Sequence, residues 1–326
     1  MKYAAVLRFL ALLTLTPLVS TPAFAEDYPS RPIKLVVGYG AGGTADATAR
    51  VYAEKLQGIL KVPVIVENKP GAYEQIAAQA VLSAPPDGYT LWWGTTGALT
   101  MGPGIRANTP YDVIKNFTQI GKIAEVEAVL AVKKDSPINS LPELIKYAKA
   151  NPRKLFYASA GVGSGNHLLT EYIMNQTGIQ LEHVPYKSDA DVARELAAGG
   201  VDFGIPVAGV AVPFVKEGKF KAIAVTGTQR LKQLPNVPTM GEEVASLNIG
   251  VYAIYGLLAP AGTPAPVVKT LSDAFNKVAE MPDVVSRLEG MNVKPAVSSP
   301  NDLRQHLDSE GKRWKELGKS LNITLN

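Results

Sequence analysis

The stretch that decides the fold begins at Ile33, ends at Asp46 and reads IKLVVGYGAGGTAD. Its apolar start predicts a buried strand over Ile33–Val37, and the glycine-rich loop that follows leads into a predicted helix over Thr44–Leu60. The same order of strand, glycine-rich loop and helix recurs at Leu155–Ile173. Two such units, one in each half of the chain, predict an α/β protein with two lobes that face each other.

The rest of the chain alternates between strands and helices, which is typical of parallel α/β sheets. Apolar runs predict further strands at 62–66, 89–93, 155–158, 183–185, 202–205 and 222–225. Helices are predicted at 75–83 and 141–150, and two more begin near Thr263 and Ser299. Segments near 120–132 and 248–259 are apolar and extended, so we expect them to cross between the lobes. The expected boundaries are 26–125 with 248–326 for lobe 1, and 126–247 for lobe 2.

The composition of the chain excludes several kinds of site. The 326 residues include no cysteine and only three histidines, and the formal charge is +4. Without cysteine there is no thiolate chemistry, no disulfide and no Cys-ligated zinc or iron–sulfur site. The basic residues form no cluster of the kind that nucleic-acid-binding proteins use. No metal, cofactor or nucleic-acid partner is therefore expected.

The first 25 residues have the order of a secretory signal peptide. Lys2 and Arg8 supply a positive start, residues 9–19 are apolar, and AFA at 23–25 matches the small-x-small pattern of a cleavage site. The apolar run is shorter than the about 20 residues that a membrane-spanning helix needs. A buried N-terminal helix is the alternative. The three ordered regions favour cleavage after Ala25 and a mature protein in the periplasm.

The first glycine-rich loop reads GYGAGG and formally matches the dinucleotide-binding pattern GxGxxG, with Glu67 at the end of the next strand. Export argues against a nicotinamide cofactor. The alternative to dinucleotide binding is that the loop binds an anion, because the free N–H groups at the start of Thr44–Leu60 favour negative charge. Asp46 stands three residues after Gly43, where it either caps the helix or belongs to a ligand shell.

The second loop, SAGVGSGNH, brings hydroxyl, amide and imidazole groups to one helix N-terminus. That set of donors suits a carboxylate, which only accepts hydrogen bonds. Neither Ser159 nor Ser164 is central in a GxSxG motif, which disfavours a serine hydrolase. His167 either caps and packs at the helix start or contacts the ligand, and the polar loop around it favours contact.

Short motifs follow one another along the whole mature chain in an ordered series. They are YPSRPI at 28–33, GGTAD at 42–46, ENKPGA at 67–72, PDGYTL at 86–91, GVGSGNH at 161–167, VPYK at 184–187, LPNVPT at 234–239 and APAGTP at 259–264. In these motifs and their order the chain resembles the extracytoplasmic solute receptors of tripartite tricarboxylate transporters, the Bug receptors.

The resemblance implies a two-lobed, type II-like periplasmic binding protein, with a parallel-rich sheet and flanking helices in each lobe and a ligand cleft between the lobes. It implies a non-enzymatic monomer that binds a small organic acid and delivers it to large and small membrane permease subunits. In lobe 1 the implied ligand shell consists of Tyr39, Gly43, Thr44, Asp46, Thr95, Thr96 and Gly97. In lobe 2 it consists of Ser159, Gly163, Ser164, Asn166, His167, Tyr186 and Asp189, while Val207 and Ala208 touch the body of the ligand.

One departure from the family pattern concerns specificity. After the PGA of 70–72 the family usually continues with glycines, whereas this chain has Tyr73 and Glu74. If both face the cleft, Glu74 disfavours a second carboxylate and Tyr73 stacks on the ligand, which favours an aromatic or amine-bearing acid. The alternative is that Tyr73 packs, as do Trp92 and Trp93, and that Glu74 is solvated.

Two rival functions remain open at this point. An exported α/β oxidoreductase or hydrolase would use the glycine-rich loops for substrate or cofactor. A receptor of this kind can also signal ligand presence to a sensor kinase.

Overall fold

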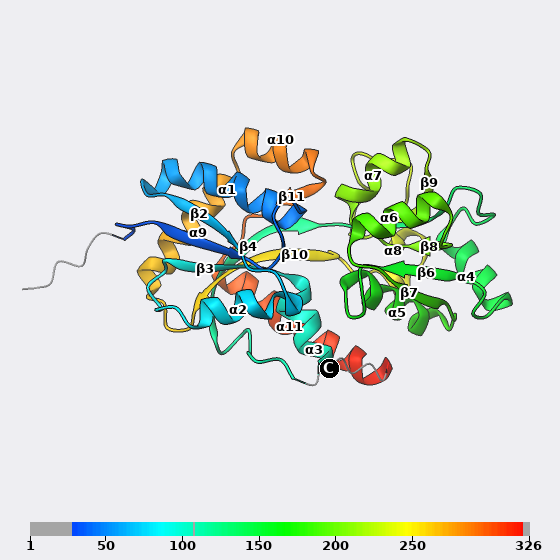
Figure 1. Cartoon of the computed structure of the whole chain (residues 1–326), viewed down its shortest axis with the longest axis horizontal. Helices are drawn as coiled ribbons and strands as arrows, with labels where there is room; N and C mark the ends of the chain where they lie inside the picture. Colours follow the sequence, from blue (N-terminus) through cyan, green and yellow to red (C-terminus); the bar gives the residue numbers. More distant parts are fainter. Residues whose placement is uncertain (1–27, 107, 322–326) are drawn as a thin grey trace, which may run out of the picture.

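The computed structural model describes residues 28–106 and 108–321, which fold into two α/β lobes side by side (Figure 1). The predicted signal peptide at 1–25 lies outside these residues. Within them, every helix is too short or too polar to cross a membrane.

Each lobe is built on one mixed sheet. The first sheet has the order β11-β4-β10-β3-β1-β2, with β1 (Ile33–Val37), β2 (Val64–Asn68), β3 (Thr90–Thr95), β4 (Phe117–Val126), β10 (Ala253–Pro260) and β11 (Val293–Pro295). The second has the order β7-β6-β8-β5-β9, with β5 (Val129–Lys133), β6 (Phe156–Ser159), β7 (Glu182–Pro185), β8 (Phe203–Gly204) and β9 (Phe220–Val225). Parallel pairing is confined to β2-β1-β3 and β7-β6-β8. The strands that run to and from the crossings pair antiparallel.

Helices cover both faces of each sheet, and an apolar core lies on each face. In lobe 1, α1 (Thr44–Leu60), α9 (Ala265–Ala279) and α10 (Pro282–Gly290) share one core, and α2 (Gln75–Leu82) and α11 (Pro300–Leu321) share the other. In lobe 2, α4 (Leu141–Ala150) and α5 (Gly165–Thr177) lie opposite α6 (Asp189–Ala198) and α7 (Ala208–Lys216).

The chain crosses between the lobes twice. β4 ends at Val126 and β5 begins at Val129, and the chain returns through residues 248–252 into β10. The Glu127 carboxyl connects both crossings: its Oε2 accepts from the Tyr252 N–H at 3.4 Å and from Thr226 Oγ1 at 2.5 Å. Burial raises the pKa of Glu127 to about 7. The exact lobe boundaries given above stay a prediction.

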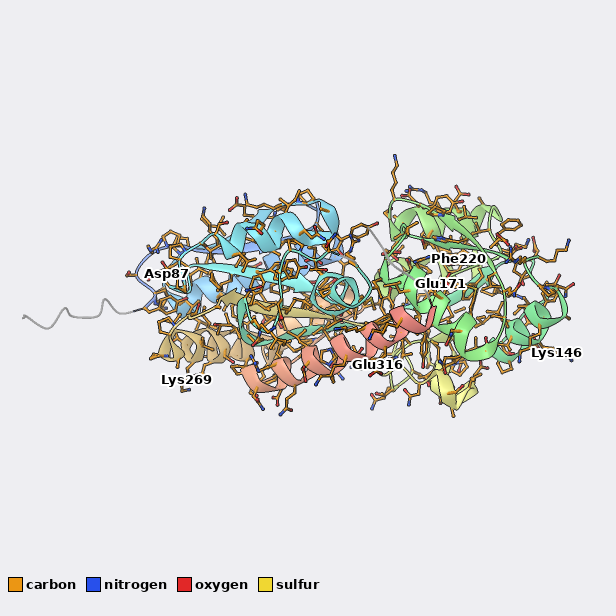
Figure 2. The ribbon with its side chains drawn as sticks, turned by 90° about the horizontal axis from the view of Figure 1, so that it is seen from below. Asp87, Lys146, Glu171, Phe220, Lys269 and Glu316 are labelled. Carbon is orange, nitrogen blue, oxygen red and sulfur yellow. The ribbon has the colours of Figure 1, made fainter. Side chains whose placement is uncertain are left out.

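The C-terminal helix α11 also reaches the junction, and in the view from below of Figure 2 it runs in front of lobe 1 up to the edge of lobe 2. Its Trp314 packs with Met101 and Ile105 of lobe 1 and with Leu168 of α5 in lobe 2. The lobes are therefore held together by the two crossings, by α11 and by side-chain contacts such as that of Lys232 Nζ with Glu289 Oε1 at 2.6 Å.

The local elements that the sequence pattern predicts most strongly have the predicted bounds. β1 and α1 begin and end where expected, and Ser140 Oγ accepts the Glu143 N–H at 3.2 Å at the start of α4. β2 instead begins at Val64, because Pro63 precedes it and its carbonyl already accepts the Ile33 N–H. Trp92 and Trp93 are both fully buried on opposite faces of β3, one in each core of lobe 1.

Candidate functional site

The two glycine-rich loops occupy equivalent places in the two sheets. The first follows β1, which lies between β2 and β3, and the second follows β6, which lies between β7 and β8. Both loops therefore leave the carboxyl edge of parallel strands, where α/β proteins bind ligands. They lead into α1 and α5. The first N–H groups of a helix have no backbone acceptor within the helix and carry partial positive charge.

Asp46 fixes the lobe 1 loop. Its carboxylate accepts from the Gly42 N–H at 2.8 Å, from Arg50 Nε at 3.0 Å and from Asn68 Nδ2 at 2.9 Å. Burial alone would raise the pKa of Asp46, but these hydrogen bonds outweigh it and hold the pKa below its ordinary value. Gly42, with φ of 87°, supplies the left-handed turn that brings its N–H to the carboxylate. The Asp46 oxygens are thus engaged within the chain.

Glu74 lies beneath the same loop and is 1% exposed. Its carboxyl accepts from the Thr95 hydroxyl and, at 3.3 Å, from the Thr95 N–H at the end of β3. Tyr39 Oη lies 3.3 Å from Thr95 Oγ1 and joins the same group. Burial raises the pKa of Glu74 to about 8, so at neutral pH this carboxyl is mostly protonated. The side chain is not solvated, and it does not supply the negative charge that the sequence suggested.

Tyr73 connects the two lobes. Its hydroxyl donates to the Val162 carbonyl, in the lobe 2 loop, at 2.5 Å. Its ring is 48% exposed and lies under the Arg106 guanidinium, 4.1 Å from the ring centroid. The side chain therefore bridges the two lobes.

The remaining predicted lobe 1 residues stand close to this group. Thr44 is the first residue of α1, and a Cβ placed on Gly209, at the start of α7 in lobe 2, would lie 3.9 Å from the Thr44 hydroxyl. Thr96 Oγ1 accepts the Ile254 N–H at 2.6 Å and so joins the end of β3 to β10. Gly97 begins a π-turn over Gly97–Met101.

In lobe 2 the polar side chains of the loop bind the loop itself. Asn166 Oδ1 accepts from the Ala160 N–H at 3.0 Å and from Ser164 Oγ at 2.6 Å, and His167 Nδ1 accepts from the Gly163 N–H at 3.2 Å. All of these groups are neutral. These contacts preorganise the loop. Asn166 Oδ1 also accepts the His167 N–H at 3.1 Å and so engages one N–H group in the first turn of α5.

A stack of rings supports this loop from below. The His167 and His183 rings lie 4.3 Å apart, and His183 also stacks on Tyr157 at 4.8 Å. Burial and, to a smaller extent, the neighbouring His183 lower the pKa of His167 to about 4. Ser159 Oγ lies 2.6 Å from His183 Nε2, and Ser159 is fully buried.

Asp189 completes the lobe 2 side. Its Oδ1 accepts from Asn166 Nδ2 at 3.1 Å and from the Val207 N–H at 3.3 Å, and burial raises its pKa to about 6. Ala208 follows as the first residue of α7, whereas the Tyr186 phenol interacts with Glu195. Asp189 thus joins the α5 and α7 termini.

Sequence reasoning missed two tyrosines from the second crossing and β10, Tyr252 and Tyr255, which are 7% and 6% exposed. Burial raises the pKa of the Tyr252 phenol, and the nearby Asp189 and Tyr39 add to the rise. A Cβ on Gly165 would lie 2.6 Å from the Tyr252 hydroxyl, so this phenol stands at the start of α5. The available signal was the run of aromatics in a segment already assigned to a crossing.

The predicted site thus gathers around two loops, three helix N-termini and several tyrosines. None of its eighteen predicted residues is arginine or lysine. Among the described residues, no group of three or more His, Asp or Glu side chains could hold a metal. The arrangement can bind an anion through N–H and hydroxyl groups. Which of the predicted residues touch a ligand stays a prediction.

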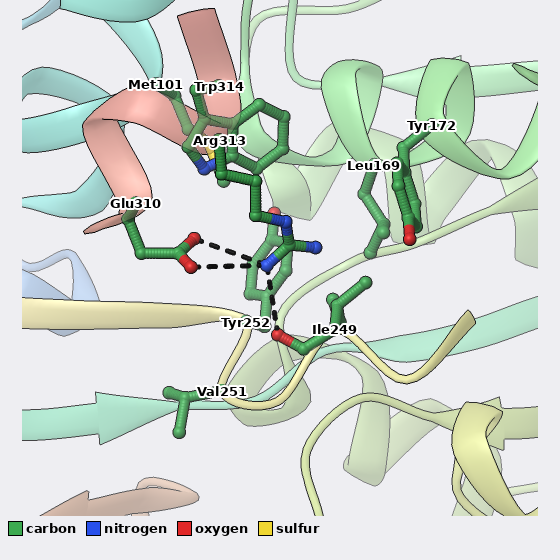
Figure 3. Close-up of a pocket in the computed structure, with 9 residues that line it drawn as sticks. All are labelled: Met101, Leu169, Tyr172, Ile249, Val251, Tyr252, Glu310, Arg313 and Trp314. Carbon is green, nitrogen blue, oxygen red and sulfur yellow. Dashed lines mark hydrogen bonds and ion pairs between the residues drawn. The ribbon is translucent and has the colours of Figure 1, made fainter. Parts of the chain in front are cut away.

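A separate small pocket lies where α11 meets α5 and the second crossing (Figure 3). Arg313 Nη1 donates there to the Ile249 carbonyl at 3.4 Å and to Glu310 Oε1 at 3.3 Å. The volume of about 10 Å³ has room for about one water molecule. This pocket is too small for an organic acid.

Comparison with known proteins places the chain in a family. The model of the tripartite tricarboxylate transporter family receptor matches residues 48–323. The UPF0065 protein in gbd 5'region of Cupriavidus necator is 36% identical over 303 residues, which are 92% of this chain and 90% of that protein.

Two solved structures are similar over almost the whole chain. R. palustris Rpa4515 with adipate has a TM-score of 0.81 and 32% identity and covers 92% of this chain and 100% of that chain. MatC from Rhodopseudomonas palustris with bound malate has a TM-score of 0.77 and 29% identity. The match covers 89% of this chain and 100% of that chain. The chain therefore belongs to the tripartite tricarboxylate transporter receptor family, whose members are periplasmic solute-binding receptors and not enzymes.

Proposed function

We propose that this protein captures a small organic acid between its lobes in the periplasm and delivers it to the large and small membrane subunits of a tripartite tricarboxylate-type transporter. The observation that carries the proposal is the pair of glycine-rich loops, each of which presents a helix N-terminus from the carboxyl edge of its sheet. The adipate and malate in two similar structures support an acid as the ligand class.

Capture requires that the two lobes close on the ligand. A ligand that contacts both loops stabilises the closed arrangement over the open one, and only this difference in affinity shifts the population. The two short crossings at 127–128 and 248–252 are the segments that absorb such a motion. The closed form then presents a surface, formed by both lobes, that the membrane subunits recognise.

A thermal-shift screen of organic acids, followed by calorimetry, tests capture. A ligand at 100 times its Kd adds about 2.7 kcal/mol to the free energy of unfolding, which raises Tm measurably. Small-angle scattering of the same samples should show a smaller radius of gyration at saturation. Absence of any Tm shift with monocarboxylates, dicarboxylates and amino acids would contradict the proposal, as would binding with an unchanged radius.

A further inference from the structure

In lobe 1, a carboxyl group of the chain itself occupies the hydrogen-bond donors at the carboxyl end of β3. Glu74 comes from the turn after β2, and its carboxyl reaches the carboxyl end of β3. There it takes the two donors of Thr95, the N–H at 3.3 Å and the hydroxyl. These are the kinds of donors that bind a ligand carboxylate at the end of parallel strands.

The backbone that carries Glu74 has a conformation suited to glycine. Ala72, Tyr73 and Glu74 have φ values of 45°, 53° and 69°, in the left-handed region that costs side-chain-bearing residues free energy. Opposite them, a Cβ placed on Gly38 would lie 2.3 Å from Glu74 Cγ. The loop after β1 therefore leaves a space that the Glu74 side chain fills.

From this geometry we infer that Glu74 acts as a built-in substitute for one ligand carboxylate, so that the cleft accepts an acid with a single carboxylate. The inference rests on the proposed function and names the class of ligand that the same site takes. The remaining carboxylate subsite is formed by the N-termini of α1 and α5. The opposite end of the ligand lies on the Tyr39 side of this group, above the buried Glu74, and must be uncharged or positively charged.

The charge state of the Glu74 carboxyl agrees with its role as a substitute for a ligand carboxylate. A protonated Glu74 donates as well as accepts, so it needs no arginine or lysine nearby, and the predicted shell contains none. The groups that face it are the Tyr39, Tyr111 and Tyr255 phenols, with Arg106 beyond Tyr111. A dicarboxylate is excluded because its second carboxylate finds the Thr95 donors already engaged.

The test compares Glu74→Gly with the isosteric Glu74→Gln by calorimetry. Glycine is favoured at this φ and empties the subsite, whereas glutamine keeps it filled without an ionisable group. The probes are malate and adipate as dicarboxylates, and lactate and benzoate as monocarboxylates. We expect Glu74→Gly to bind at least one dicarboxylate at least tenfold more tightly than the wild type, and Glu74→Gln to change by less than twofold.

Each outcome decides a separate point. Tight binding of malate or adipate by the wild type, or no gain in Glu74→Gly, overturns the inference and leaves the proposed function standing if any acid binds. A gain in Glu74→Gly, while the wild type binds no acid at all, supports the filled subsite and contradicts the proposed ligand class. An equal gain in Glu74→Gln would show that charge rather than occupancy excludes the dicarboxylate, which also overturns the inference.

Discussion

The two glycine-rich loops have the same plan but are held by different chemistry. In lobe 1 the loop is tied by the charged group of Asp46, Arg50 and Asn68 and rests on the buried Glu74 carboxyl. In lobe 2 the loop is tied by the neutral Asn166 and His167. The same anion-binding shape is therefore compatible with two kinds of support.

The difference teaches that polar residues in a binding loop often serve the loop before the ligand. Both loops engage their own polar side chains in hydrogen bonds within the chain. The charge state of the support then decides how each loop responds to pH. Lobe 1 depends on a carboxyl that titrates near neutrality, while the imidazole of lobe 2 stays neutral there.

The largest expected effect is the pH dependence that Glu74 imposes on lobe 1. Its pKa rises from 4.5 to about 8 on folding, so between these values the folded state holds a proton that the unfolded state has lost. The contribution of the Glu74 proton to the free energy of unfolding is fully present below pH 4.5 and is lost as the pH rises through 8. Relative to Glu74→Gln, the wild type should lose about 1.4 kcal/mol of unfolding free energy per pH unit. Urea unfolding at several pH values measures this.

The difference in unfolding free energy between the wild type and Glu74→Gln isolates the effect of Glu74 from that of other carboxyls with a raised pKa, such as Asp189. His167 serves as the control from lobe 2. Its pKa is lowered to about 4, so its contribution is lost only as the pH falls below 6.5. Parallel stability curves for the wild type and Glu74→Gln between pH 6 and pH 8 would show that Glu74 is not protonated in the folded protein.

The second prediction concerns Asp46, the charged residue that holds the lobe 1 loop in place. Asp46→Ala leaves the Gly42 N–H, Asn68 and Arg50 without their common acceptor and should lower the free energy of unfolding by roughly 2–3 kcal/mol. Chemical denaturation gives the value. The matched control is Asp273→Ala, which breaks the exposed pair with Lys269 and should cost at most about 1 kcal/mol. Equal losses for both variants would contradict a special role for Asp46.

The corresponding substitution in lobe 2, Asn166→Ala, should lower the free energy of unfolding by less than Asp46→Ala does. Asn166→Ala removes an acceptor shared by the Ala160 N–H and Ser164 Oγ, and also a donor to Asp189. It should lower the free energy of unfolding by about 1–2 kcal/mol, because the lost acceptor is a neutral amide rather than a carboxylate. It should also weaken ligand binding, because the loop loses its fixed shape. Calorimetry with the tightest ligand from the screen measures that loss, and unchanged affinity would show that the loop needs no such support.

The sequence predicted the elements whose cause is local. β1 and α1 follow from an apolar run and a helical pattern beside glycines, and their bounds agree with the structure. The position of β10 between β3 and β4 does not follow from its own residues, because it depends on a chain return after more than a hundred residues. Periodicity carries no information about such pairing.

The site was predictable to the same extent. Motifs located both loops, but could not show that Asn68 donates to the Asp46 carboxylate from 22 residues away. Tyr73 and Glu74 were recognised as unusual. Their left-handed backbone, and hence the direction of Glu74 into the space beside Gly38, could not be read from residue types that rarely adopt it.

The smallest expected effect concerns the contact that joins the two loop regions. Tyr73→Phe removes the hydrogen bond to the Val162 carbonyl but keeps the ring beneath Arg106. A neutral hydrogen bond contributes about 1 kcal/mol, and this one exists only while the lobes are together, so the closed population should fall about fivefold relative to the open one. Ligand affinity should fall by up to the same factor, because binding must then supply the missing closure energy.

Tyr147→Phe is the matched control, since that phenol is exposed on α4 and far from the junction. Calorimetry and small-angle scattering should distinguish the two variants, with weaker binding and a larger ligand-free radius of gyration only for Tyr73→Phe. Identical behaviour would mean that the Tyr73 contact forms in the open arrangement as well. The loops would then be joined by the crossings, α11 and the other side-chain contacts between the lobes, and Tyr73 would serve only to cover Glu74.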